Sequence, residues 1–217
     1  MAQQERAIRT RRTILAAAAA VFDECGYESA TIAQILARAE VTKGALYFHF
    51  TSKEELARGV LDAQLLQGAV LPQAFKLQEL VDVTMAVAYR LPGDPLLRGG
   101  VRLAVEQAGD FGGGPFPAWV ELCAGLVAEA KAQGEVLPHV EPEAVAELVV
   151  GAWTGIQLLS QRMTRRADLE RRVATFWSHV LPGIAVPGVL PHLDTAEDRG
   201  ARVVRDFERS AGRRIAG

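Results

Sequence analysis

The chain has 217 residues, of which 49% are hydrophobic, and its formal net charge is −2. This length allows a substantial core in one or two domains, and the hydrophobic content excludes a disordered chain. The nearly balanced charge argues against a general polyanion binder. Alanine and leucine dominate while alternating Val/Ile/Thr patterns are scarce, so we expect an all-α fold.

Basic residues gather at the start of the sequence. Arg6, Arg9, Arg11 and Arg12 stand among the first twelve residues against one acid, Glu5. A DNA-binding face is often locally basic on a mildly acidic protein, so we expect Arg9 and Arg11 to lie near a DNA backbone or minor groove. The alternative is a solvated, partly frayed helix end.

Residues 10–22 have the outline of a secretory signal peptide, with a basic start and a short apolar run. Against this interpretation, alanine is only weakly apolar, two acids end the run, and no A-x-A cleavage site follows. Apolar residues recur at helical steps from Leu15 to Cys25, which predicts an amphipathic helix over residues 4–25 that Gly26 ends. No stretch approaches the ~20 apolar residues of a membrane span, so we expect a cytoplasmic protein without membrane attachment.

Residues 31–50, TIAQILARAEVTKGALYFHF, have the pattern of two short helices joined by a tight turn. The first begins at a capping box between Thr31 and Gln34 and continues with apolar residues at three- and four-residue steps. Thr42 can cap the second helix. In such a helix-turn-helix the second helix enters the major groove of DNA, whereas an ordinary helical hairpin with a solvated face has the same spacing.

The second helix should present a DNA-reading face. Lys43 can reach phosphates or guanine acceptors, Tyr47 can meet a phosphate or a thymine methyl, and Gly44 permits close approach. We expect Phe48 to face inward with Ala45 and Leu46. The residues expected at the DNA are Arg9, Arg11, Thr31, Thr42, Lys43, Gly44, Tyr47, His49 and Lys53.

A fourth helix is predicted over residues 52–67. Ser52 and Glu55 have the spacing of a second capping box, and free backbone N–H groups there would clamp a DNA phosphate together with Lys53. Later helices, separated by Pro and Gly, are predicted over residues 76–91, 94–107, 118–133, 141–163, 167–180 and 195–211. Long apolar faces on 141–163 and 167–180 suggest a helix–helix seam between two subunits.

Catalytic and metal-binding patterns are missing from the sequence. The histidines are scattered, at positions 49, 139, 179 and 192. Neither a nucleophile–base arrangement nor a metal cluster is recognisable, and the Gly-rich stretch 109–117 lacks the flanking signals of a nucleotide-binding loop. Cys25 and Cys123 are far apart and are more typical of core residues than of a disulfide, which suits a reducing cytoplasm. We therefore expect neither an enzyme nor a bound cofactor.

The segment VTKGALYFHFTSKEEL, residues 41–56, resembles the DNA-binding core of the TetR family of bacterial transcriptional repressors. Its GALYFHF spelling is most similar to the branch that binds γ-butyrolactones and related autoregulators in actinomycetes. Looser similarity continues in GVRLAVEQ, PFPAWVE and GAWTGIQLLS, which begin at residues 100, 115 and 151. The resemblance implies a TetR-like fold, with a helix-turn-helix domain over 1–51 and a ligand-binding and dimerisation domain over 52–217, in which helix 52–67 is the linker.

One position departs from the family pattern. Glu40 stands where the family usually has glycine at the turn. A left-handed backbone there would cost a residue with a side chain about 1 kcal/mol. We expect Glu40 to be tolerated in a slightly less stable turn.

The resemblance also implies a ligand site. The family's ligand tryptophan in the P-F-x-x-W segment matches Trp119, and its pocket threonine in the W-T-G-x-Q segment matches Thr154; Gln64 is carried over with less support. The alternatives are a core aromatic at Trp119 and an intrahelical hydrogen bond at Thr154.

Together these features predict a homodimeric, ligand-responsive repressor. It would bind a pseudo-palindromic operator in double-stranded DNA and be released by a small effector, a γ-butyrolactone or a similar lactone or furan. Two alternatives stay open: a repressor that answers to a drug or metabolite and controls efflux or metabolism, and a helical scaffold that binds only protein.

Overall fold

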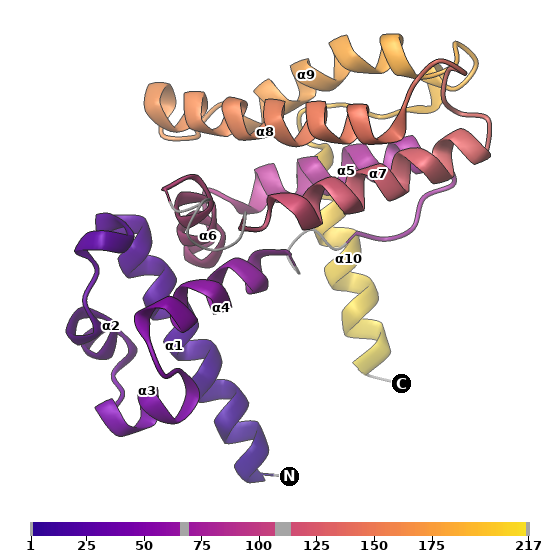
Figure 1. Ribbon diagram of the computed structural model, residues 1–217. Helices are drawn as coiled ribbons and strands as arrows, with labels where there is room; N and C mark the ends of the chain where they lie inside the picture. The colour runs from indigo at the N-terminus through magenta and orange to yellow at the C-terminus, as the bar shows by residue number, and fades with distance from the viewer. Residues whose placement is uncertain (1, 66–69, 107–113, 216–217) are drawn as a thin grey trace. The chain divides into compact units, whose positions relative to one another are not determined.

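The computed structural model describes residues 2–65, 70–106 and 114–215, and this part of the chain consists of ten α-helices joined by turns (Figure 1). A single isolated bridge, between Val136 and Ala185, is its only β-type pairing. The all-α prediction is therefore confirmed. The chain divides into two compact units, Met1–Gln67 with Gly93–Pro117, and Gly68–Pro92 with Ala118–Gly217.

The first unit packs four helices around a long first one. Its helices are α1 (Ala2–Ser29), α2 (Ile32–Ala39), α3 (Lys43–His49), α4 (Lys53–Leu65) and α6 (Pro95–Glu106). As predicted, Gly26 interrupts α1, with φ 79° and ψ 169°, a conformation that only glycine adopts without strain. Phe22, Ile35, Leu46 and Phe50 form the centre of one shared core.

Helix α6 is fixed to the end of α1 by packing and by charge. A Cβ atom at Gly99 would overlap the backbone of Ala19, so the two helices cross at close range. The Arg98 Nε atom donates to Asp23 at 2.6 Å, and Arg102 donates to the Asp23 carbonyl oxygen at 2.6 Å. Both α4 and α6 thus pack with the helix-turn-helix, and the expected boundary at residue 51 stays a prediction.

The second unit is built around α5. Its helices are α5 (Lys76–Arg90), α7 (Phe116–Ala132), α8 (Pro142–Thr164), α9 (Leu169–Ile184) and α10 (Arg199–Ile215), with a 3-10 turn at Leu190–His192. Nearly every residue of α5 from Leu77 to Ala88 is buried, because α9 and α10 both pack on it. The predicted positions of these helices are confirmed to within a few residues.

A buried ion pair anchors the last helix. Arg199 donates through Nε and Nη2 to the fully buried carboxylate of Asp82 at 2.7 and 2.6 Å. The Gln78 amide pairs with the backbone of Asp194 before α10, and Gly200 permits close contact with the Met85 carbonyl. The last helix therefore packs on the core over its first turns.

A buried carboxylate begins α5 from a distant point in the sequence. Glu135, in the turn between α7 and α8, accepts hydrogen bonds from the backbone N–H groups of Lys76 and Leu77 at 2.8 and 2.9 Å. The backbone oxygen of Glu135 also accepts from the Val186 N–H. One side chain thus satisfies two of the unpaired donors at the start of the central helix.

The first prediction concerns this contact. Glu135→Ala is expected to lower the free energy of unfolding by about 1–3 kcal/mol, because two buried N–H groups lose their acceptor. Urea denaturation measures the change. Glu208→Ala, at an exposed acid of α10, is the control and should cost no more than about 0.5 kcal/mol. Equal losses in the two variants would contradict the assignment.

Candidate nucleic-acid interface and effector site

The two helices of the helix-turn-helix are capped as their sequence predicts. The Thr31 Oγ1 atom accepts from the Gln34 N–H at 3.2 Å, and the Gln34 side chain accepts from the Thr31 N–H at 2.8 Å. The Thr42 Oγ1 atom accepts from the Ala45 N–H at 3.2 Å. Both threonines are exposed and fix where the helices begin, so their expected contact with DNA would add to a structural role.

The turn between the two helices has a left-handed residue at position 40, where the family usually has glycine. Glu40 is left-handed, with φ 54° and ψ 39°, and its N–H donates to the Leu36 carbonyl oxygen. The side chain of Glu40 is exposed. The chain therefore closes this turn at the cost of local strain.

On the outer face of α3, Lys43 and Tyr47 lie one helical turn apart. The Lys43 Nζ atom lies 5.8 Å from the centre of the Tyr47 ring, and both side chains are exposed. Gly44 has no neighbouring atom within 4 Å of a hypothetical Cβ, so its backbone is open to a close partner. Lys43, Gly44 and Tyr47 thus lie outward together.

The prediction that Phe48 faces inward is wrong. Its side chain is 80% exposed, whereas Leu46 and Phe50 are buried. Successive helical residues turn by about 100°, so a residue two positions after the buried Leu46 must lie on the opposite side. The sequence already contained this spacing. Phe48 therefore adds an apolar ring to the outer face of α3, one turn from Gly44.

His49 is less open than expected. It is half-buried, and its ring packs edge-on against Phe48 with the ring centres 5.0 Å apart. Arg9 and Arg11 are exposed on α1, and the Arg11 guanidinium lies 5.0 Å from the centre of the Phe50 ring. This contact places Arg11 close to the end of α3.

Lys53 is held by the protein itself. Its Nζ atom donates to the carbonyl oxygens of Tyr27 and Ala30 at 2.9 and 3.2 Å and lies 4.4 Å from the centre of the Tyr27 ring. At the same helix start the Glu55 carboxylate accepts from the Thr51 N–H and hydroxyl, which hold the pKa of Glu55 below its ordinary value. A phosphate clamp at this helix start stays a prediction, and the observed contacts favour a structural role.

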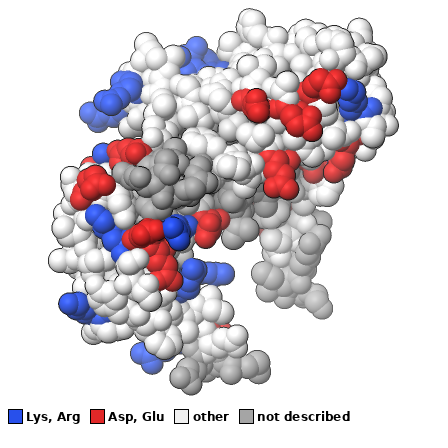
Figure 2. Space-filling model, in the orientation of Figure 1, with Lys and Arg blue, Asp and Glu red and all other residues white. Residues whose placement is uncertain are grey.

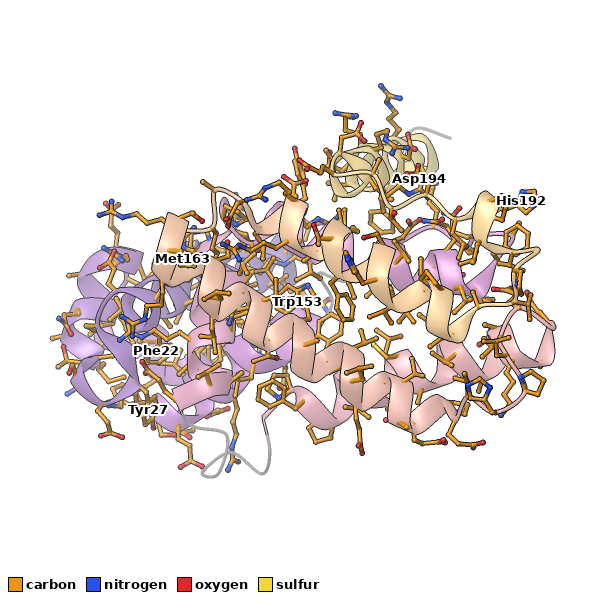
Figure 3. The ribbon with its side chains drawn as sticks, turned by 90° about the horizontal axis from the view of Figure 1, so that it is seen from above. Phe22, Tyr27, Trp153, Met163, His192 and Asp194 are labelled. Carbon is orange, nitrogen blue, oxygen red and sulfur yellow. The ribbon has the colours of Figure 1, made fainter. Side chains whose placement is uncertain are left out.

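Two of the residues expected at the effector, Trp119 and Thr154, lie on different helices of the second unit. Trp119 is half-buried on α7, and Thr154 on α8 donates its hydroxyl to the Val150 carbonyl oxygen at 2.8 Å. The side chain of Gln64 lies outside the described residues. A further indole lies beside Thr154 on α8: Trp153, labelled in Figure 3. It donates through Nε1 to the Thr84 carbonyl oxygen at 3.3 Å.

The residues that the structure describes give little support for a metal site or a reactive thiol. They hold no group of three or more His, Cys, Asp or Glu side chains that could bind a metal ion. Burial raises the pKa of the Cys123 thiol to about 11, so this thiol is protonated and unreactive near neutral pH. None of the described helices is long and apolar enough to cross a membrane.

A capped helix-turn-helix with an exposed second helix, together with a separate helical unit, defines a DNA-binding regulator. The chain belongs to the TetR family. Residues 14–60 match the family of bacterial regulatory proteins of the tetR type, and residues 74–187 match the tetracycline repressor-like C-terminal domain.

Its relatives are similar along most of the chain. The A-factor receptor protein of Streptomyces griseus is 45% identical over 195 residues, which cover 89% of this chain and 70% of that protein. TylP, a TetR regulator from Streptomyces fradiae, has a TM-score of 0.86 and 48% identity, over 93% of this chain and 98% of that one. A γ-butyrolactone receptor described as ArpA-like has a TM-score of 0.71 and 33% identity, over 93% and 99%.

These relationships establish the kind of protein. TetR regulators bind DNA operators as dimers and respond to small-molecule effectors. The protein is therefore a ligand-responsive transcriptional repressor of this family and not an enzyme.

The strained turn gives the second prediction. Glu40→Gly is expected to stabilise the protein by about 0.5–1 kcal/mol, because glycine adopts the left-handed conformation without the penalty of a Cβ atom. Thermal unfolding measures the gain. Glu40→Ala removes the charge and keeps the Cβ atom, so it should not stabilise; an equal gain from both variants would assign the effect to charge.

The third prediction concerns the outer face of α3. Phe48→Ala should weaken operator binding about tenfold without changing its salt dependence, because it removes apolar contact only. Lys43→Ala should weaken binding and reduce the salt slope by about 1. Gel-shift titrations at several salt concentrations separate the two. Leu122→Ala, at an exposed apolar residue of α7, is the control; wild-type affinity of Phe48→Ala would refute the contact.

Proposed function

We propose that this repressor is released from its operator by a γ-butyrolactone or a related lactone or furan. The observation that carries the proposal is similarity that extends through residues 74–187, beyond the helix-turn-helix, to proteins named as A-factor and γ-butyrolactone receptors. Trp119 and Thr154 are the side chains proposed to contact the effector. Operator binding would take place in the bacterial cytoplasm.

DNA would be read by two copies of α3. A dimer places two recognition helices in successive major grooves, about 34 Å apart along a pseudo-palindromic operator. The α3 face offers a cation at Lys43, two aromatic rings at Tyr47 and Phe48, and an open backbone at Gly44. Arg9 and Arg11 would add contacts to the DNA backbone or minor groove.

The surface proposed for dimerisation is a stripe along α8. Its members are exposed and recur at helical steps: Leu148, Gly151, Gly155, Leu159 and Met163. Neither glycine has an atom within 4 Å of a hypothetical Cβ, so packing within the chain does not require glycine at either position. Two small residues four apart instead let a second helix approach closely, near the middle of α8.

Charge along α8 favours an antiparallel pair. Glu143 and Glu147 lie in its N-terminal half and Arg162 and Arg165 at its C-terminal end, all exposed. In Figure 2 the red groups of the second unit gather toward its right-hand end, with blue beside them, and blue groups lie at the upper left. In a two-fold symmetric pair, the acidic end of each α8 faces the basic end of its partner.

Release requires the effector to bind one conformation of the dimer better than the other. A ligand shifts such an equilibrium only by its difference in affinity for the two states. The effector would favour the conformation whose two α3 helices are wrongly spaced for the operator.

Gel-shift titration on DNA upstream of the protein's own gene tests the function directly. The wild-type protein should bind this DNA, and a γ-butyrolactone with a hydrophobic side chain should release it. Release by a drug-like compound but not by any lactone would favour the alternative repressor of efflux or metabolism. Failure to bind any DNA would favour a protein-binding scaffold.

The fourth prediction concerns the effector. Trp119→Ala should bind the operator normally, but the lactone concentration for half-release should rise at least about tenfold, because a large aromatic contact is lost. The gel-shift with added lactone measures both quantities. Leu122→Ala on the same helix is the control. A normal lactone response in the Trp119 variant would remove this residue from the site.

The fifth prediction concerns the dimer. Leu159→Glu should convert the protein to a monomer in sedimentation experiments and weaken operator binding, because it places a charge in the α8 stripe. Leu122→Glu is the matched control, since Leu122 on α7 is 41% exposed and Leu159 is 50% exposed. A dimer that survives Leu159→Glu would place the interface elsewhere.

A further inference from the structure

Among the described residues of α8, Gln157 has a buried side-chain donor that makes no hydrogen bond. Its side chain is fully buried, with 0% exposed. Its Nε2 group has no hydrogen-bond acceptor among the described residues. A buried amide N–H without a partner destabilises the folded protein, so its presence calls for a functional reason.

The orientation of this amide is fixed by a neighbour. The Arg166 Nη2 atom donates to the Gln157 Oε1 atom at 3.4 Å. Turning the amide over would bring its N–H groups against the guanidinium, donor against donor, so oxygen must face Arg166. Arg166 is itself buried and left-handed at φ 69°, and its backbone N–H donates to the Ser160 carbonyl oxygen. The Nε2 group therefore points away from Arg166.

Four other polar side chains of this region donate within the protein. Trp153, one turn before Gln157, donates to the Thr84 carbonyl oxygen, and Trp177 donates to the Thr84 hydroxyl at 2.7 Å. Thr154 donates to Val150, and Ser160 donates to Asp168 at 2.6 Å. Figure 3 shows Trp153 on α8 in the second unit, on the same helix face as Gln157 by its four-residue spacing. Along this face, the Gln157 amide is the donor left for a ligand.

We propose that the Gln157 Nε2 group donates a hydrogen bond to the carbonyl oxygen of the effector. This inference rests on the proposed function and adds to it a residue that the sequence comparison did not single out. A lactone carbonyl is a neutral acceptor with no donor of its own, which suits a neutral N–H in apolar surroundings. Gln157 would then distinguish a carbonyl-bearing ring from an otherwise identical ring without it.

A pair of ligands and a pair of variants test the contact. The ligands are a γ-butyrolactone with a hydrophobic side chain and the matched tetrahydrofuran, which lacks only the carbonyl. The variants are Gln157→Met, which removes the amide at similar volume, and Gln157→Glu, which keeps an acceptor for Arg166 but has no N–H. Isothermal titration of the full-length dimer gives each affinity.

The wild-type protein should prefer the lactone to the tetrahydrofuran by about tenfold, the worth of one hydrogen bond in a site without water. Both variants should reduce this preference to about threefold or less while their affinity for the tetrahydrofuran stays the same. Operator affinity without ligand should not change. Thermal unfolding measures the stability of both variants, since Gln157→Met also removes the acceptor of the Arg166 Nη2 atom. If Gln157→Met does not fold, Gln157→Glu alone decides.

Three results would overturn the proposal, and only one of them would also overturn the proposed function. An unchanged preference in the variants would mean that the amide serves only an ordered water or the fold, and the proposed function would stand. A wild-type protein that binds neither ring would overturn the proposed function and this contact together. A loss of ligand binding that merely follows a loss of stability would also count against the contact.

Discussion

Helix α3, the proposed recognition helix, is stable because it packs into a shared core. Isolated helices as short as α2 and α3, with 8 and 7 residues, are unstable in water. Phe22 from α1, Ile35 from α2, and Leu46 and Phe50 from α3 and its end are buried in one cluster, which supplies the missing stability. Because Leu46 and Phe50 are held in this core, the opposite side of α3 must face outward. The core therefore decides which side chains of α3 face outward and are proposed to contact DNA.

Much of the fold could be predicted from the sequence because the signals were local. Thr31, Gln34 and Thr42 cap the helices as their spacing predicts, and Gly26 ends the regular part of α1. The pattern failed where residues far apart in sequence meet. No local pattern around Glu135 predicts that its side chain caps the start of α5. No pattern around Asp82 predicts its ion pair with Arg199, more than a hundred residues away. Such contacts follow from tertiary packing, which periodicity does not contain.

The site was predictable to a smaller extent. Lys43, Gly44 and Tyr47 lie outward as expected, but the position of Phe48 was misjudged because its apolar character was given more weight than its place on the helix. Lys53 resembled a free cation in the sequence, yet the carbonyl oxygens of Tyr27 and Ala30 surround it. The role of the Gln157 amide could not be anticipated, since the sequence does not record which donors remain unpaired after folding.

The glycine at the crossing of α1 and α6 restricts how the first unit can move. Since no side chain fits between Gly99 and the backbone of Ala19, a slide of α6 that brings Arg98 to the crossing is blocked. The side-chain stem of an arginine cannot enter it, and the ion pair from Arg98 to Asp23 would break at the same time. The close backbone contact and the ion pair thus couple α6 to α1, so we expect the two helices to move together.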